Sequence, residues 1–201
     1  MSKYEQLVET KTFLQENGIG HIDFGMILGS GLGELAGEVK NPLIFDYKDI
    51  PNFPVSTVVG HAGRLVYGEL EGKQVLIMDG RFHYYEGYDM ETVTFPIRLM
   101  KLLDVATIIV TNSAGGANPT FEPGDLMIIT DQINYTGTNP LIGPNDDRFG
   151  PRFPDMSHAY HEYGQEVVRK AAKELNINIK EGVYMGYSGP TYETPAEIRF
   201  T

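Results

Sequence analysis

Three strand-like stretches of this chain each run into glycine or small polar residues, and this arrangement constrains the fold more than any other feature. The transitions lie at residues 28–33, 78–85 and 110–116. In open α/β sheets, ligands bind beyond the carboxyl ends of the strands. We therefore expect a sheet whose strand ends bring these three segments to one binding site.

Helix and strand patterns alternate along the chain, without internal repeats or a linker. Helices are expected from the Ser2–Glu5 capping box to near Gly18, over Thr92–Leu103 and, with Ser157 as cap, over Met156–Leu175. Strands are expected at Phe24–Leu28, Arg64–Leu70, Gln74–Met78, Val105–Val110, Leu126–Thr130 and Gly182–Met185. This alternation predicts an α/β fold with a mainly parallel or mixed sheet, formed by residues 1–201 as a single domain.

Some of these patterns are specific enough to predict burial and pairing. Val105–Val110 is the clearest buried strand, and Arg64–Leu70 forms a hairpin pattern with Gln74–Met78. The first helix is expected to carry one apolar face, made of Tyr4, Leu7, Val8 and Leu14.

The last residues of the chain contain a strong helix start. Thr194 is a typical cap, Pro195 suits the first helical position, and Glu197 stands three residues after the cap. Only residues 198–201 follow, whereas helices usually run about eight residues or more. We therefore expect this sequence to be a C-terminally truncated form of a longer polypeptide.

The composition excludes several classes of function. The 201 residues include no cysteine, which removes disulfides, thiolate metal sites and a cysteine nucleophile, and agrees with a reducing cytoplasm. The formal net charge of −11 repels nucleic acid, so an anionic ligand must be held by local donors. No apolar run reaches the length of a membrane span, and the five histidines form no cluster at metal-ligand spacing. We expect no nucleic-acid, membrane or metal partner.

The segment Gly80–Tyr88 concentrates chemically active side chains. It holds a guanidinium, an imidazole, a carboxylate and three phenols, where a plain connecting loop favours Gly, Pro, Asn, Asp and Ser. Arg81 and His83 are two residues apart, so in an extended segment both side chains project to the same side and can face one anion. The other interpretation is a tyrosine-rich surface loop in which Arg81 pairs with Glu86.

Two glycine-rich segments are candidates for close backbone contact with an anion. Gly29–Gly33 follows a strand pattern and adds the Ser30 hydroxyl. Glu34 replaces the third glycine of a dinucleotide-binding fingerprint, and no P-loop lysine follows. Gly60–Arg64 adds another imidazole, that of His61. By itself, each segment is better explained as a plain turn.

Two later segments place aromatic rings beside polar groups. Pro144–Pro154 is a long polar loop with two phenylalanines, which either anchor it to its own core or reach a neighbouring subunit. Tyr192 and Glu193 follow a strand, where the ring could stack on a flat heterocycle while the carboxylate accepts its N–H protons. By itself, Glu193 is better explained as a solvated loop acid.

Taken in order, these segments resemble those of the trimeric purine nucleoside phosphorylases, from about Phe24 to the last residue. The matching segments are Gly29–Gly33, Ile50–Pro54, Gly60–Arg64, Gly80–Tyr88, Thr111–Gly116, Gly143–Phe153 and Gly189–Glu197. The resemblance implies a mixed β-sheet with a small barrel-like portion, flanked by helices. It also places part of the family's pocket beyond residue 201.

The resemblance implies phosphorolysis of purine (deoxy)ribonucleosides to free base and (deoxy)ribose 1-phosphate, a purine-salvage reaction of a cytoplasmic homotrimer. Inorganic phosphate is then a co-substrate, and no cofactor is expected. The implied phosphate-binding residues are Ser30, His61, Arg81, Phe82, His83 and the backbone at Ser113. Tyr85 and a neighbouring subunit's Phe153 would contact ribose, while Tyr192 and Glu193 would bind the base. Catalytic roles fall to Glu193 and to His83, oriented by Glu86.

Three other functions remain open from the sequence. A methylthioadenosine phosphorylase shares the chemistry, but the Tyr192–Glu193 pair argues against it, because adenine has no N1–H for a carboxylate to accept. A non-catalytic module that binds purine or phosphate is the second. A dinucleotide-binding oxidoreductase is the third.

Overall fold

The computed structural model of the chain describes residues 1–55 and 63–201. These residues form two compact units, Met1–Ser113 and Ala114–Thr201. The assignment of residues 1–201 to a single domain stays a prediction.

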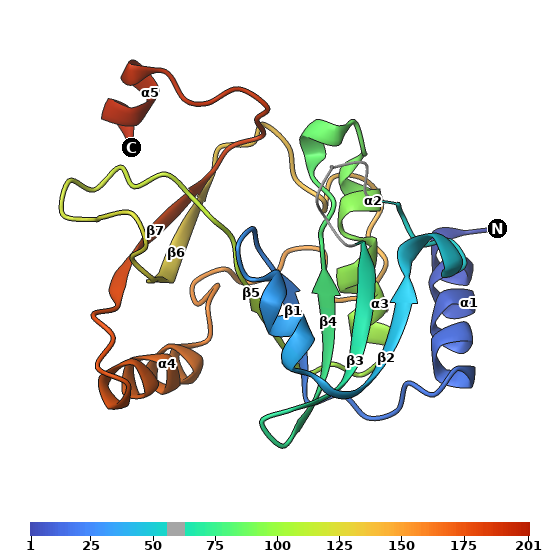
Figure 1. Cartoon of the computed structure of the whole chain (residues 1–201). Coiled ribbons are helices and arrows are strands. Elements are labelled where there is room, and N and C mark those ends of the chain that lie inside the picture. The colour runs from blue at the N-terminus through green and yellow to red at the C-terminus, as the bar shows by residue number, and fades with distance from the viewer. Residues whose placement is uncertain (56–62) are drawn as a thin grey trace. The chain divides into compact units, whose positions relative to one another are not determined.

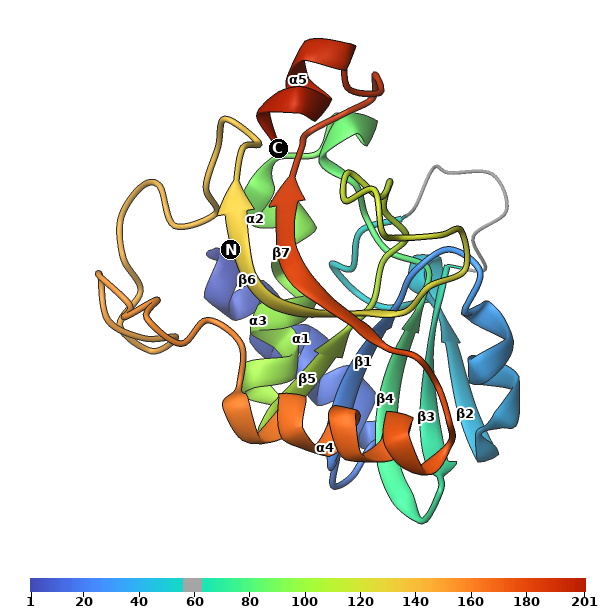
Figure 2. The same cartoon turned by 90° about the vertical axis from the view of Figure 1, so that its left-hand side faces the viewer.

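The first unit is built on a five-stranded sheet with the strand order β2-β3-β4-β1-β5 (Figure 1). The five strands lie side by side in this order in the view of Figure 2. Their bounds are β1 Phe24–Leu28, β2 Lys40–Asp46, β3 Arg64–Leu70, β4 Lys73–Asp79 and β5 Thr107–Val110. β1 runs parallel to both β4 and β5, whereas β2, β3 and β4 pair antiparallel. The expected mixed α/β sheet is confirmed.

The hairpin predicted between residues 64 and 78 is present. β3 and β4 are joined at Glu71 and Gly72, which have φ values of 49° and 74°. Two consecutive residues with positive φ match the right-handed twist of the paired strands. This turn sets the register that places Arg64 opposite Asp79 at the other end of the ladder.

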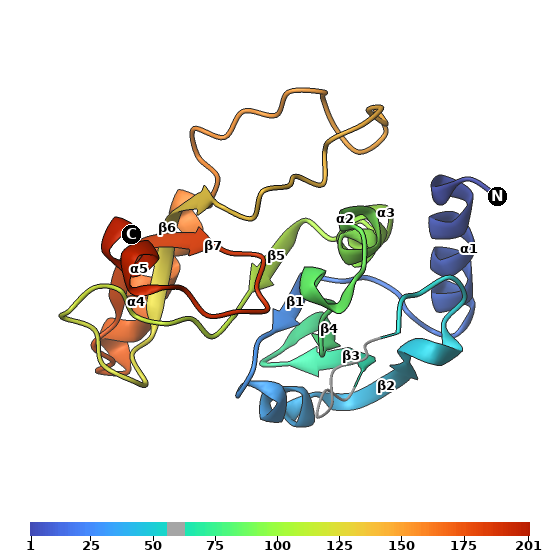
Figure 3. The same ribbon diagram turned by 90° about the horizontal axis from the view of Figure 1, so that it is seen from above.

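Helices cover one face of this sheet, and a short 3₁₀-helix covers the other (Figure 3). On the first face, α1 (Lys3–Glu16) packs beside α3 (Phe95–Leu102). On the second, η1 (Gly33–Glu38) lies over the central strands. The core on that side consists of Leu28, Ala36, Val39, Val66, Val75 and Ile77. Alternate strand residues thus meet opposite layers, as the period of two in a strand requires.

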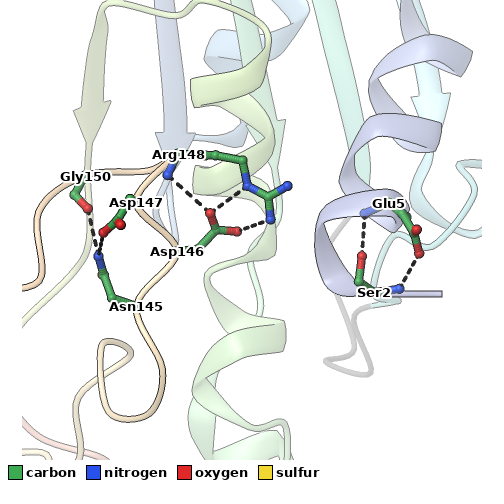
Figure 4. A network of polar contacts seen from close by, with 7 residues as sticks. All are labelled: Ser2, Glu5, Asn145, Asp146, Asp147, Arg148 and Gly150. Atoms are coloured by element: carbon green, nitrogen blue, oxygen red, sulfur yellow. Dashed lines mark hydrogen bonds and ion pairs between the residues drawn. The ribbon is translucent and has the colours of Figure 1, made fainter.

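The capping box predicted at the start of α1 is confirmed (Figure 4). The Glu5 amide donates to Ser2 Oγ over 3.2 Å, and the Ser2 amide donates to Glu5 Oε2 over 2.6 Å. The predicted apolar face is only partly right. Leu7 and Leu14 are buried together with Thr10, whereas Val8 is exposed because the helix turns it away from the sheet.

Two other expectations for the first unit need correction. The helix predicted over residues 92–103 is split at Thr94 into α2 (Met90–Val93) and α3, with Pro96 in the first turn of α3. β5 is shorter than the predicted strand, and its Ile109 and Val110 are exposed. The reason is that β5 is the edge of the sheet and, among the described residues, pairs with β1 alone.

The second unit contains a parallel pair of strands and two helices. The strands are β6 (Met127–Asn134) and β7 (Lys180–Gly186), and the helices are α4 (Glu162–Glu174) and α5 (Pro195–Phe200). In Figure 2, α4 lies near the beginnings of both strands. Arg169 of α4 donates to both carboxylate oxygens of Glu181 on β7, over 2.8 and 2.7 Å. Among the described residues, neither sheet closes into a barrel.

The two helix starts predicted in the second unit differ in outcome. The Thr194–Glu197 capping box at α5 is confirmed. Ser157 does not cap α4, which begins later, with His161 accepting from the Gly164 amide. The reason is local, because the amide and hydroxyl of Ser157 are both bonded to the Asp155 carboxylate.

None of the helices formed by the described residues combines the length and the apolar character needed to cross a membrane.

A cluster of aromatic rings ties the loop after β4 to the core of the first unit. Tyr47, in the short helix η2 (Tyr47–Asp49), packs against Phe53 and Phe82, and Phe53 packs against Phe95. The buried Tyr47 hydroxyl donates to the Gly80 carbonyl over 2.6 Å. Burial, and to a lesser extent the Asp79 charge, raises the pKa of the Tyr47 phenol far above its ordinary value, so this donor keeps its proton.

We expect the Tyr47→Phe variant to be destabilised, because the buried Gly80 carbonyl would lose its donor. A buried polar group left unpaired costs about 1–3 kcal/mol of unfolding free energy. Tyr67→Phe is the matched control. The Tyr67 hydroxyl also bonds to a carbonyl, that of His21, but in an exposed position where water can replace it. Urea unfolding of both variants measures the difference, and equal losses would contradict the role assigned to Tyr47.

Candidate functional site

The carboxyl ends of three adjacent parallel strands form the candidate site. β4, β1 and β5 are neighbours in the sheet, and they end at Asp79, Leu28 and Val110. The segments that follow these strands therefore begin side by side, at the end of the sheet where the three strands terminate. This confirms the predicted convergence of the three strand-to-loop transitions, as far as Ser113, where the first unit ends.

A hydrogen-bonded contact joins the first and third of these segments. The Gly29 amide donates to Thr111 Oγ1 over 2.8 Å, and that hydroxyl donates to the Ile27 carbonyl over 3.0 Å. The backbones approach so closely that a Cβ added to Gly29 would lie 2.7 Å from Asn112 Cα and 2.8 Å from the Thr111 carbonyl oxygen. Only glycine fits this position without a backbone shift. The turn that carries Ser30 is thereby fixed to the end of β5.

The second segment reaches the same place through Arg81. The half-buried Arg81 side chain lies against the end of β5, with Nη1 3.4 Å from the Thr111 carbonyl oxygen. Thr111 thus contacts both of the other segments. This role of the Thr111 side chain is not among the expectations from sequence, where its position at the end of an apolar strand is the one signal. The interpretation in which Arg81 pairs with Glu86 is wrong, because His83 holds Glu86.

His83 and Glu86 form a buried polar pair on the loop after β4. Glu86 Oε1 accepts from the His83 amide over 2.8 Å and lies 2.9 Å from His83 Nδ1. The two side chains are 14% and 3% exposed. The two residues are three apart in the sequence, and the short helix η3 (Tyr84–Glu86) turns the chain so that the Glu86 side chain reaches His83. Donation from Nδ1–H to the carboxylate fixes the tautomer whose lone pair lies on Nε2.

The aromatic residues of this loop have two different environments. Tyr85 is exposed, and its ring stacks on His83 with centroids 4.7 Å apart and planes 19° apart. Phe82 is buried in the aromatic cluster, where it packs against Tyr47, Phe53 and Tyr88. The Phe82 side chain therefore anchors the loop, and only its backbone is available for the predicted contact with phosphate.

The remaining phosphate-binding candidates have less defined surroundings. Ser30 and Ser113 are exposed on the segments that follow β1 and β5. His61 lies outside the described residues. The expected phosphate-binding set therefore has Ser30, Arg81, His83 and Ser113 at one edge of the sheet, and the role of each stays a prediction.

The candidate base- and ribose-binding residues of the second unit are mostly exposed. Tyr192 is 95% exposed, and the half-buried Glu193 follows it, just before α5. A cis peptide bond joins Gly189 to Pro190 in the same connection. Phe153 is 85% exposed, which excludes the interpretation that this ring anchors its loop to the core.

The loop that carries Phe153 is held by its own polar contacts (Figure 4). Arg148 donates through Nε and Nη2 to the two oxygens of Asp146, over 2.7 and 2.6 Å. Asn145 Nδ2 bonds to Asp147 Oδ1 and to the Gly150 carbonyl. Further along, Arg152 Nη1 donates to the Leu141 carbonyl over 2.7 Å. The loop is thus shaped locally while it leaves Phe153 in solvent.

The groups that the first unit brings together are chemically suited to an oxyanion. They are the Arg81 guanidinium, the buried His83–Glu86 pair and the glycine turn with the exposed Ser30. All follow the carboxyl ends of neighbouring strands. Arginine binds oxyanions with two parallel hydrogen bonds, and backbone amides at strand ends add further donors. In the part of the chain that the structure describes, no group of three or more His, Asp or Glu side chains could hold a metal ion.

Comparison with known proteins identifies the relatives of this chain. A model of the phosphorylase superfamily matches residues 23–201. The chain is 58% identical over 196 residues to purine nucleoside phosphorylase 1 of Bacillus subtilis (strain 168), covering 98% of the chain and 72% of that protein. It is 49% identical over 199 residues to the purine nucleoside phosphorylase of Rattus norvegicus, covering 96% and 69%.

Solved structures agree with these matches. The crystal structure of isoform 2 of the Schistosoma mansoni purine nucleoside phosphorylase, with cytosine and ribose-1-phosphate, superposes with a TM-score of 0.93 at 42% identity. The match covers 98% of this chain and 71% of that one. A Schistosoma mansoni purine nucleoside phosphorylase in complex with adenosine gives a TM-score of 0.92, also at 42% identity, covering 98% and 71%.

We expect the Thr111→Val variant to lose stability, because it removes the hydroxyl between the Gly29 amide and the Ile27 carbonyl while keeping the side-chain shape. The expected loss is about 1–2 kcal/mol of unfolding free energy. Thr107→Val is the matched control, since Thr107 is exposed on β5, the strand that Thr111 directly follows. Urea unfolding measures both. Equal stabilities for the two variants would show that the Gly29–Thr111 contact does not hold the turn in place.

Proposed function

Because the chain belongs to the phosphorylase superfamily, and within it to the purine nucleoside phosphorylases, we propose that it cleaves purine (deoxy)ribonucleosides with inorganic phosphate. The products are the free purine base and (deoxy)ribose 1-phosphate, as in purine salvage. The observation that supports this proposal is the convergence of the segments after β4, β1 and β5, which carry side chains suited to an oxyanion. It fits the co-substrate that distinguishes a phosphorylase from a hydrolase.

The chemistry explains why the site holds donors but no nucleophilic side chain. Breaking the N-glycosidic bond gives the sugar oxocarbenium character, as in glycoside hydrolysis. Phosphate itself stabilises that cation and then forms the new bond at the sugar C1 atom. The protein has to position the phosphate and balance its charge. Arg81 is suited to donate two parallel hydrogen bonds to phosphate, and the Ser30 hydroxyl and the Ser113 amide would supply neutral donors.

His83 is suited to form a hydrogen bond with phosphate in either protonation state of the phosphate. With Nδ1–H donating to Glu86, the neutral ring accepts a hydrogen bond at Nε2 from the P–OH group of hydrogen phosphate. The protonated ring donates to a phosphate oxygen instead. Glu86 stabilises the protonated form and orients the ring in both. Tyr85, stacked on His83, is the proposed ribose contact.

We assign the base and the far side of the ribose to the second unit and to a neighbouring subunit. Tyr192 would stack on the purine, and the Glu193 carboxylate would accept a hydrogen bond from the N1–H of a 6-oxopurine, which orients the leaving base. The exposed Phe153 would close the ribose pocket of a neighbour in a homotrimer. No cofactor is needed, since phosphate is the second substrate. Nucleoside salvage would place the enzyme in the cytoplasm.

The direct test is release of hypoxanthine from inosine by the whole chain, with and without phosphate. We expect base release that requires phosphate and yields ribose 1-phosphate in equal amount, measured by chromatography. Inosine should be a better substrate than methylthioadenosine, whose adenine has no N1–H for Glu193 to accept. Binding of phosphate or guanine by calorimetry without turnover would favour a binding module instead, and turnover without phosphate would contradict a phosphorylase.

We expect Arg81→Lys to impair the use of phosphate, because lysine keeps the charge but loses the planar bidentate grip. The loss of one charge-assisted hydrogen bond should lower kcat/KM for phosphate by about 10- to 100-fold. Arg199→Lys, exposed on α5 and outside the three loops, is the matched control and should change kcat/KM by less than about twofold. Phosphate saturation curves at saturating inosine measure both. An unimpaired Arg81→Lys enzyme would contradict the assignment of Arg81.

A further inference from the structure

A buried carboxylate lies at the same sheet edge as the proposed phosphate site. Asp79 is the last residue of β4, directly before Gly80 and Arg81, and it is 8% exposed. A buried charge is unfavourable unless it is paired, and a negative one also repels an anion bound nearby. The proposed reaction gives Asp79 no role.

The partner of Asp79 is an arginine on the neighbouring strand. Arg64 is the first residue of β3 and lies directly opposite Asp79 in the antiparallel ladder. Its Nε is 2.9 Å from Asp79 Oδ2. The Arg64 side chain is 36% exposed, so the buried carboxylate is paired with a guanidinium that also contacts solvent.

The strand register places this ion pair beside the glycine turn. Arg64, Asp79 and Leu28 are direct partners on β3, β4 and β1, and adjacent strands lie about 4.8 Å apart. Leu28 immediately precedes the turn that carries Ser30. At the other end of that turn, a Cβ on Gly33 would lie 3.4 Å from Asp79 Oδ1. Asp79 therefore contacts the turn and precedes the Arg81 loop.

We propose that Arg64 is a positioning residue for phosphate, which acts by neutralising the Asp79 carboxylate beside the Gly29–Gly33 turn. The proposal rests on the proposed function and adds a residue to its phosphate site. Without Arg64, the bound phosphate would face an uncompensated buried acid. At an effective dielectric constant of about 20 and a separation of about 10 Å, one unit charge changes the affinity for an anion by roughly tenfold or more.

A purely structural ion pair predicts something different. It would lower stability when either partner is removed, and it would affect both substrates alike. The electrostatic role predicts opposite effects of the two single substitutions on phosphate, because one exposes the negative charge and the other removes it. It also predicts that phosphate is affected selectively.

The test measures the binding of inorganic phosphate to the whole chain by calorimetry, for wild type, Arg64→Met, Asp79→Asn and the double variant. We expect Arg64→Met to weaken phosphate binding about tenfold, and Asp79→Asn to keep or tighten it by up to about threefold. The double variant should return to within about threefold of wild type. In steady-state assays, KM for phosphate should follow these changes while KM for inosine stays within about twofold.

Arg169→Met is the matched control, because Arg169 is also paired with a carboxylate, that of Glu181, but in the second unit and on the surface. It should leave phosphate binding unchanged. If Arg64→Met does not fold, Asp79→Asn and the charge-neutral double variant still decide the question. Weakened phosphate binding by Asp79→Asn, or by the double variant to the level of Arg64→Met, overturns the role of Arg64. It leaves the proposed function standing. Absence of phosphate binding by the folded wild type overturns the proposed function as well.

Discussion

The hydrogen bond from the Gly29 amide to the Thr111 hydroxyl is the contact on which the geometry of the site depends. It fixes the turn after β1 to the end of β5 at a separation that admits no side chain on residue 29. The Thr111 carbonyl then faces Arg81 from the loop after β4. One residue at a sheet edge thus sets the relative positions of three loops that are far apart in the sequence, and a site for a small anion needs this precision.

An acidic chain can bind an anion only where the local field is reversed, and the first unit shows how this is arranged. The formal net charge of the chain is −11. At the proposed site, however, Arg81 is positively charged and the Glu86 carboxylate is paired with His83. Asp79, the other buried acid at this edge, is paired with Arg64. Both of these buried carboxylates are thus paired with a basic side chain. In this account, charge pairing matters as much as the donors that touch the ligand.

Much of the architecture could be predicted from sequence because its signals are local. The bounds of β1, the hairpin, both capping boxes and the convergence of the strand ends follow from apolar periodicity, turn residues and cap spacing. Features set by tertiary context could not be predicted. Whether Val8 or Val110 is covered depends on which layer packs there, and Phe82 faces the core because Tyr47 and Phe53 lie behind it. The role of Thr111 exists only once β5 lies beside β1.

The most direct measurement is a crystal structure of the whole chain grown with inorganic phosphate. We expect one phosphate at the ends of β4, β1 and β5, within hydrogen-bonding distance of Arg81 and of the turn that carries Ser30, with Glu86 still bonded to His83 Nδ1. Phosphate bound elsewhere, or these loops turned away from one another with no anion between them, would contradict this expectation.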